Sequence, residues 1–281
     1  MIVSRLLIEF ILFSFLGWVW ESLFDTFRKH QWDNRGFLFG PICPIYGSSV
    51  VLGDLLFQGI ATHTGQNPAD LPVWQVFLVG MVGSAVMEYL TSYVMEKRFH
   101  ARWWDYSKLP LNLNGRISLP TSAGFGAAGV LIVRYALPLY SRLDAAVSDN
   151  LAVLISLILT ALLSADFALT ETNLNDLLKQ IQDAEAEFNS HMESRYKRLE
   201  SSGMRLREGR EAVQQRIKDA EEIRLSQSSL AKLDGARRRY MHQLHSIQGF
   251  RTEGHTRIAG QMRDYLEQAR EQRKADRKSK H

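Results

Sequence analysis

The chain has 281 residues, of which 46% are hydrophobic and 23% are charged, averages that are typical of a soluble protein. The charges are segregated, however: residues 1–172 carry 11 basic and 13 acidic side chains, a net charge of −2, whereas the last 109 residues carry a net charge of +6. All seven Pro, all six Trp and the single Cys lie before residue 139, and this composition excludes a disulfide framework, a collagen-like chain and a fully disordered chain.

Five segments of the first portion, residues 1–172, are long and apolar enough to cross a bilayer, which takes about 20 residues. The predicted spans lie near 2–24, 42–61, 73–95, 120–140 and 151–172. The first lacks the basic start and the cleavage site of a signal peptide, so we expect it to be retained. The sequence therefore predicts an all-α, polytopic membrane helix bundle followed by a cytoplasmic, coiled-coil-like helical tail, residues 173–281.

Basic residues in the connecting loops predict the orientation. The loops after the first and third spans hold three and five Lys or Arg, whereas residues 62–72 hold none and residues 141–150 hold one. Lys and Arg accumulate in cytoplasmic loops. We therefore expect a multi-pass protein of the cell inner membrane, with its N-terminus outside and its tail in the cytoplasm.

Two spans carry a carboxylate on a face of small residues. The two stripes are Ser14, Gly17, Glu21 and Asp25 in the first span, and Gly80, Ser84, Glu88 and Ser92 in the third. Charged groups inside a membrane are costly and typically face the bundle interior or water. Glu21 and Glu88 are thus candidates for a substrate or ion path. The alternative is that the small residues serve close packing and that Glu21 lies at the interface.

Further polar positions fall near the predicted helices, namely Asp54, Arg134 and Asp166. Arg134 is expected either to extend its head group to the membrane surface or to pair with a carboxylate.

Several sequence patterns resemble known motifs, but we do not expect the usual functions of those motifs here. Gly124, Gly126 and Gly129 spell the dinucleotide fingerprint, but no strand precedes them, so they are expected to serve close helix packing. The sequence has no phosphate-binding loop motif, so the chain is not itself a P-loop ATPase. Cys43 has no neighbouring soft ligand, and we expect neither a metal nor a cofactor. Without a nucleophile motif we expect no catalytic residues and no enzyme; acid–base chemistry by Glu and Arg is the weakest alternative.

Three blocks of sequence are more specific. They are Phe15-Leu16-Gly17-Trp18-Val19-Trp20-Glu21 with residues 34–47 (NRGFLFGPICPIYG); Met87-Glu88-Tyr89; and Trp103-Trp104-Asp105-Tyr106-Ser107 with Asn112-Leu113-Asn114-Gly115-Arg116-Ile117. In this order they resemble the bacterial ABC-transporter permease family called type IV, over roughly residues 5 to 170. The resemblance implies a permease that works with a separate ATP-binding subunit, and it names no substrate.

The loops of these blocks lead to a hypothesis about the site. Gly and Pro in the first block predict a loop that dips into the membrane interface, not a helix. Arg35 and Arg116 lie near the ends of the spans that carry Glu21 and Glu88. Together with Asp105, these four residues are predicted to form one charged cluster on the cytoplasmic side, which binds a substrate or locks the loops. The alternative is an aromatic belt with basic loops that follow the orientation rule.

The tail, residues 173–281, has apolar residues at helical spacing from Leu174 to Ala220, which predicts long amphipathic helices. Breaks near residues 226–229 and 249–254 indicate two or three helices in an antiparallel hairpin. The tail is predicted to dock a partner, to self-associate or to touch anionic lipid; nucleic acid is not expected because no set of stacking aromatic residues accompanies the basic clusters. The leading function is a permease component, and the alternative is a membrane scaffold or regulator that recruits partners through the tail.

Overall fold

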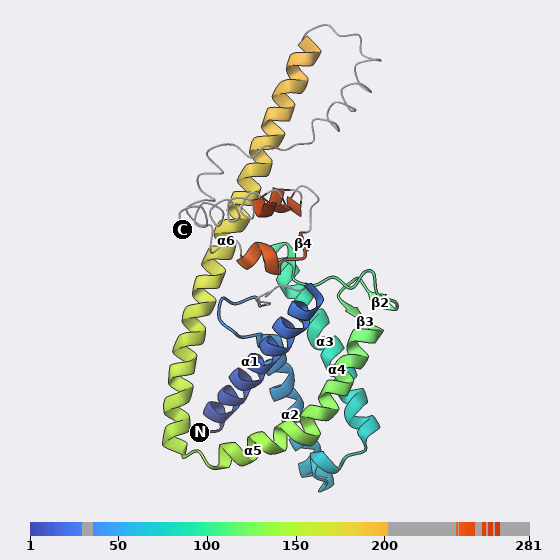
Figure 1. Ribbon diagram of the computed structural model, residues 1–281, viewed down its shortest axis with the longest axis vertical. Helices are drawn as coiled ribbons and strands as arrows, with labels where there is room; N and C mark the ends of the chain where they lie inside the picture. The colour runs from blue at the N-terminus through green and yellow to red at the C-terminus, as the bar shows by residue number, and fades with distance from the viewer. Residues whose placement is uncertain are drawn as a thin grey trace, which may run out of the picture. The chain divides into compact units, whose positions relative to one another are not determined.

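The computed structural model describes residues 1–29, 36–201, 240, 242–250, 255–256, 258–260 and 262–264 (Figure 1). The chain divides into two compact units, the first Met1–Glu171 with Ser246–Gly249, and the second Thr172–His245 with Phe250–His281.

Helices make up most of the described chain. In order they are α1 (Ile2–Lys29), α2 (Pro44–Thr64), η1 (Pro68–Asp70), α3 (Val73–Phe99), α4 (Leu119–Leu131), η2 (Ile132–Ala136), α5 (Leu137–Ala145) and α6 (Asp149–Ser201). The strands have two residues each: β1 (Ala101–Arg102), β2 (Asn112–Leu113), β3 (Ile117–Ser118) and β4 (Gly249–Phe250). Strands β2 and β3 pair antiparallel, with Leu113 opposite Ile117.

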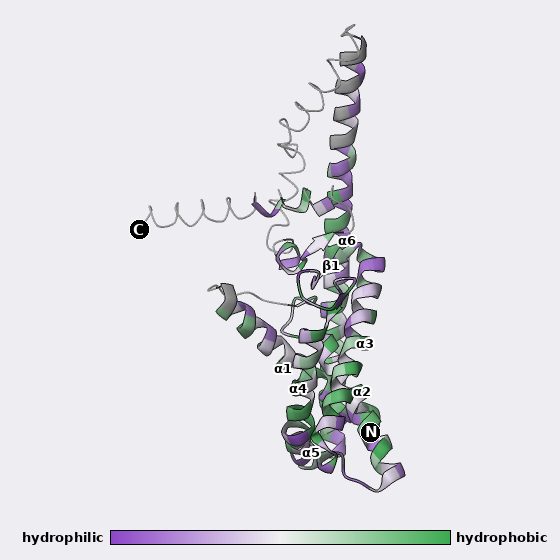
Figure 2. Ribbon diagram, turned by 90° about the vertical axis from the view of Figure 1, so that its right-hand side faces the viewer, coloured by the Kyte–Doolittle hydropathy of each residue, from purple (hydrophilic) through white to green (hydrophobic). Residues whose placement is uncertain are grey.

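Five helical segments among the described residues are long and apolar enough to cross a membrane. They are Ile2–Phe27, Pro44–Thr64, Val73–Phe99, Leu119–Ala145 and Asp149–Glu187. Figure 2 shows the apolar colouring along the middle of α2, α3 and α4 and the polar colouring along the C-terminal half of α6. The all-α fold class and the number of spans are confirmed, and the chain is a multi-pass membrane protein.

The helix ends differ from the predicted spans where capping decides them. Helix α2 begins at Pro44, because proline fixes φ and needs no hydrogen-bond partner at the first helical position. The loop prediction for the first sequence block is therefore correct for residues 36–43 and wrong for residues 44–47. Helix α2 ends at Gly65, whose φ of 68° closes the last turn by a hydrogen bond to Ala61.

The fourth span is not a straight helix. After α4 the backbone forms a π-helical turn, η2, and Pro138 then opens α5. A π turn and a proline are two of the few causes of a sharp helix bend. Figure 1 shows α5 turning away from the direction of α4 at this point. The predicted span of residues 120–140 therefore covers only part of a bent segment.

Glycines of the small-residue stripes and of the G-x-G-x-x-G motif lie where helices pack closely. A Cβ added at Gly80 of α3 would lie 3.5 Å from the Cα of Gly126 and 3.7 Å from that of Gly129 in α4, so the two backbones almost touch. Between α1 and α2, a Cβ at Gly17 would overlap the ring of Tyr46, and one at Gly47 would overlap the backbone of α1. The packing interpretation of the G-x-G-x-x-G pattern is confirmed for Gly126 and Gly129, whereas a Cβ at Gly124 would meet nothing within 4 Å.

The second unit has an apolar core of its own. Three residues of α6, Leu177, Ile181 and Ala184, are buried against later segments of the unit, and the rest of this cluster is Tyr240, Leu244, Ile258, Ala259 and Met262. The amphipathic spacing of the first part of the tail is thus confirmed. Residues 242–246 are helical and the helix stops before Gly249, whereas the predicted break at 226–229 lies outside the described residues.

Candidate functional site

The C-terminal half of α3 holds the loop that follows it, residues 100–118. Glu88, Ser92 and Glu96 are spaced by four residues, so they share one face of the helix. Each of them binds a residue of the loop. The arrangement lies at the end of the bundle where α3 ends and α4 begins, which we call the loop end (Figure 1).

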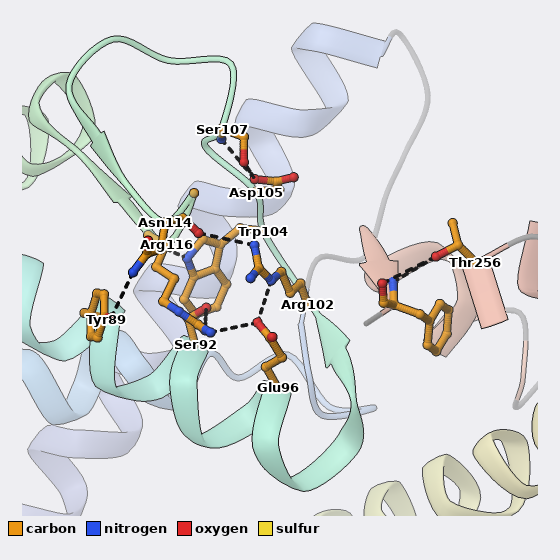
Figure 3. A network of polar contacts seen from close by, with 12 residues as sticks. Tyr89, Ser92, Glu96, Arg102, Trp104, Asp105, Ser107, Asn114, Arg116 and Thr256 are labelled. Carbon is orange, nitrogen blue, oxygen red and sulfur yellow. Dashed lines mark hydrogen bonds and ion pairs between the residues drawn. The ribbon is translucent and has the colours of Figure 1, made fainter. Parts of the chain in front are cut away.

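A buried ion-pair network fixes the base of the loop (Figure 3). The Arg116 guanidinium lies 2.9 Å from Glu96 Oε2 and donates to Ser92 Oγ at 3.0 Å. It also lies 5.7 Å from the ring centres of both Tyr89 and Tyr93. Glu96 Oε2 accepts a second bond from Arg102 Nε at 2.5 Å. One carboxylate thus pairs with two guanidinium groups, and the loop is attached to α3 at two points.

Backbone geometry closes the loop above this network. The indole N–H of Trp104 donates to the carbonyl of Arg116 at 3.0 Å, and the amide of Tyr106 donates to the carbonyl of Gly115 at 2.8 Å. Asn114 and Gly115 have φ values of 53° and 68°. Two left-handed residues in succession form the tight turn for which Asn-Gly is the preferred sequence.

Asp105 serves the loop itself and does not pair with Arg116. Its Oδ1 accepts from the hydroxyl of Ser107 at 2.5 Å and from the amide of Ser107 at 2.9 Å. Partial burial acts to raise the pKa of Asp105, but these hydrogen bonds, with the charges of Arg102 and Lys108, outweigh it and hold the pKa below its usual range. The carboxylate is therefore ionised, and its Oδ1 accepts hydrogen bonds from the turn at Ser107.

Glu21 and Glu88, the two carboxylates predicted to line a path, are each bound by a tyrosine. The Tyr46 hydroxyl of α2 donates to Glu21 of α1, and the Tyr106 hydroxyl of the loop donates to Glu88 Oε1 at 3.1 Å. Glu21 and Glu88 lie within electrostatic reach of each other, as do Tyr46 and Tyr106. We call these four residues the Glu–Tyr group. Three helices and the loop meet there.

Glu88 retains an unused acceptor. Its side chain is only 5% exposed, and Oε2 has no hydrogen-bond partner within the described parts of the chain. A buried carboxylate oxygen without a donor is costly. The site is thus complementary to a group that donates hydrogen bonds or carries a positive charge.

The loop of residues 36–43 is fixed by the fifth span. Asp166 of α6 accepts from the amides of Phe39 at 3.1 Å and Gly40 at 2.9 Å. The Phe37 ring packs on Phe99 and Trp103, with ring centres 5.6 and 5.4 Å apart. Both loops of the loop end are thereby packed together.

A second set of polar contacts lies at the opposite end of the bundle. Arg5 of α1 pairs with Asp144 at 2.6 Å and with Asp149 at 2.8 Å. Glu9 is 3% exposed, and its Oε1 has no partner among the residues that the structure describes. Arg134 donates to the carbonyls of Ala69 and Leu71, the latter at 2.5 Å. Its head group thus reaches backbone carbonyls of the loop between α2 and α3 and does not pair with a carboxylate among the described residues.

The predicted charged cluster is divided into separate contacts. Glu21 and Glu88 share the Glu–Tyr group, whereas Arg116 pairs with Glu96 and Asp105 with Ser107. Arg35 lies outside the described residues. No printed contact joins the two glutamates directly to Arg116 or Asp105, and the role of these residues in one substrate-binding cluster stays a prediction.

The sequence contained signals for the residues that were missed. Glu96 continues the four-residue stripe of Gly80, Ser84, Glu88 and Ser92 and was omitted because the predicted span stops at residue 95. Asn114-Gly115 is the strongest short hairpin signal. No local signal identifies the tyrosines as partners of the glutamates, because the contacts join residues of different segments.

Comparison with known proteins assigns the membrane portion of the chain to a family. Residues 8–171 match the family described as "Putative ABC-transporter type IV". The chain belongs to this family. The matched range contains the Glu–Tyr group, the Arg116–Glu96 pair and the Asp166 contacts, but not Arg5. No curated protein and no solved structure matches the chain.

Proposed function

We propose that the chain is the permease-like component of an ABC-type transporter and works with a separate ATP-binding subunit. Family membership supports this role, as does the absence of a phosphate-binding loop motif from the sequence, since the energy source must then lie on another chain. In this proposal the loop end and the tail face the cytoplasm, the N-terminus lies outside, and the membrane is the inner membrane. The chain itself has no enzymatic role.

The single observation that carries the proposal is the unpartnered Oε2 of Glu88 inside a membrane span. Intramembrane carboxylates that are not neutralised by a basic partner are typical of substrate and ion paths. The second carboxylate, Glu21, lies within electrostatic reach. We infer a path that runs past the Glu–Tyr group and takes a solute with an ammonium group or several hydrogen-bond donors. Arg116 and Asp105 position the loop and do not bind the solute.

The test is affinity purification of the tagged full chain, and of a chain that ends at Thr172, from mild detergent, followed by mass spectrometry of the bound proteins. The proposal expects an ATP-binding protein with both chains, because the docking surface is assigned to the loops of the first unit. Recovery of no ATP-binding protein with either chain contradicts it.

A scaffold or regulator is the second candidate, and the separate core of the second unit favours it. Leu177 and Ile181 are fully buried in that core, so the tail is more than a solvated arm. The same purification distinguishes the two functions: partners that appear only with the full chain, without an ATP-binding protein, support the scaffold. Self-association through the tail predicts that the full chain has a larger oligomer mass than the shorter one.

A further inference from the structure

The loop end carries a rigid apolar hairpin, residues 109–119, which we call the leucine hairpin. Strands β2 and β3 pair in it, and the Asn114-Gly115 turn joins them. A Cβ at Gly115 would overlap the side chains of Asp105 and Ser107, so the turn fits closely on the preceding segment. The Arg116–Glu96 ion pair then attaches the hairpin to α3. The position of the hairpin along the axis of α3 is therefore fixed.

The hairpin exposes its apolar side chains. Their exposed fractions are 37% for Leu109, 76% for Leu111, 54% for Leu113 and 47% for Leu119. Leu111 also has a φ of 50°, in the left-handed region that favours glycine. Packing inside the protein does not account for a strained leucine that is three-quarters exposed. Residues held in such a conformation are typically found at functional sites.

The leucines form one wall of an apolar groove. Its volume is about 590 Å³, within the size range of ligand pockets. Leu111, Leu113 and Leu119 line one side. The opposite side is the outer face of α3 with Val82, Val86 and Leu90, each more than half exposed.

The surroundings of the groove indicate what fills it. In the most apolar stretch of α3 only 11% of the residues are buried within the described chain, so we expect its outer face to contact lipid. The groove is continuous with that surface and ends under the hairpin, near the polar groups of Tyr89 and Ser118. Lys108 next to the leucines is exposed and suits the headgroup region.

We propose that the leucine hairpin lies in the membrane interface and that the groove beneath it holds the acyl chain of a bilayer lipid. Interfacial segments bind a bilayer with their apolar side chains toward the acyl chains and their polar side chains toward the headgroups. The buried Arg116–Glu96 pair keeps the leucines at the depth of the groove mouth. The inference does not depend on transport activity.

The first test measures the depth of the hairpin with nitroxide labels on the full chain. Cys43 is the only cysteine, so Cys43→Ser allows single labels at Leu111→Cys, at Leu113→Cys and, as the control, at the exposed Lys108→Cys. In phosphatidylcholine vesicles, the labels at 111 and 113 are expected to collide with oxygen and to be shielded from a water-soluble nickel complex, and the label at 108 to show the reverse. Equal access of all three labels to nickel overturns the proposal. Broadening between labels at 111 of two copies also overturns it, because a second copy then covers the groove.

The second test concerns the groove itself. Phosphatidylcholine with a photoreactive group on its acyl chain is expected to label peptides of residues 81–90 and 109–119. Val86→Trp fills the groove and should reduce this labelling several-fold. Ile158→Trp, at a position on α6 that is as exposed as Val86 and does not line the groove, is the matched control and should leave it unchanged. Equal labelling in both variants contradicts the acyl-chain site.

Discussion

Removing the charge of Glu96 should release the loop of residues 100–118. In Glu96→Gln the volume and one hydrogen-bond acceptor remain, but the Arg116 guanidinium loses its ionic partner. The two side chains are 10% and 16% exposed. Breaking a buried ion pair costs about 3–5 kcal/mol, and we take about 3 kcal/mol because Ser92 remains as a partner. The more exposed pair with Arg102 adds less than about 1 kcal/mol.

Hydrogen exchange measures this loss directly. A change of about 3 kcal/mol in the local opening equilibrium corresponds to about 100-fold faster exchange. The informative amides are those of Tyr106 and Arg116, which bond to carbonyls within the loop. The control is Glu171→Gln: its pair with Arg98 has the same chemistry, but the side chains are 34% and 55% exposed. We expect less than about fivefold change there. If both variants change loop exchange equally, the ion pair does not hold the loop.

Three further predictions follow from single contacts. Asp166→Ala leaves two backbone amides of residues 36–43 unpaired, which should cost about 1–3 kcal/mol each and expose that loop to protease, whereas Asp166→Asn retains an acceptor. Gly17→Ala should lower thermal stability by about 1–3 kcal/mol through overpacking, while Gly53→Ala, with open space around it, should not. Because the folded pKa of Asp105 is lowered, its stabilisation is complete above ~pH 4 and is lost on acidification. The difference in thermal midpoint between wild type and Asp105→Asn should therefore shrink as the pH falls; a constant difference would contradict this assignment.

The membrane helices were predictable because apolar length is a property of the sequence alone. The number of spans follows from five apolar runs, and the continuous α6 follows from the absence of Gly and Pro between residues 149 and 201. Helix ends were less predictable, since Pro44 both interrupts an apolar pattern and starts a helix.

The partners of the charged residues were not predictable to the same extent. Arg116 has several acidic residues within reach in the sequence, and only the hairpin turn selects Glu96. Arg134 binds backbone carbonyl groups, and since every residue has one, the sequence does not indicate which of them Arg134 binds. Glu21 and Glu88 were identified because a carboxylate in an apolar run is rare, but their tyrosine partners come from α2 and from the loop. The sequence thus identifies the intramembrane carboxylates, whereas their hydrogen-bond partners are known only from the folded structure.

The central claim is that Glu88 lies on the transport path of an ATP-driven complex. The most direct measurement is the rate of ATP hydrolysis by the complex purified with the full chain, reconstituted in lipid, for wild type and for Glu88→Gln. Loss of an ionisable hydrogen-bonding site corresponds to about a tenfold or greater fall in rate, while Asp54→Asn on α2 should leave the rate close to that of wild type. An unchanged rate in Glu88→Gln would contradict the account.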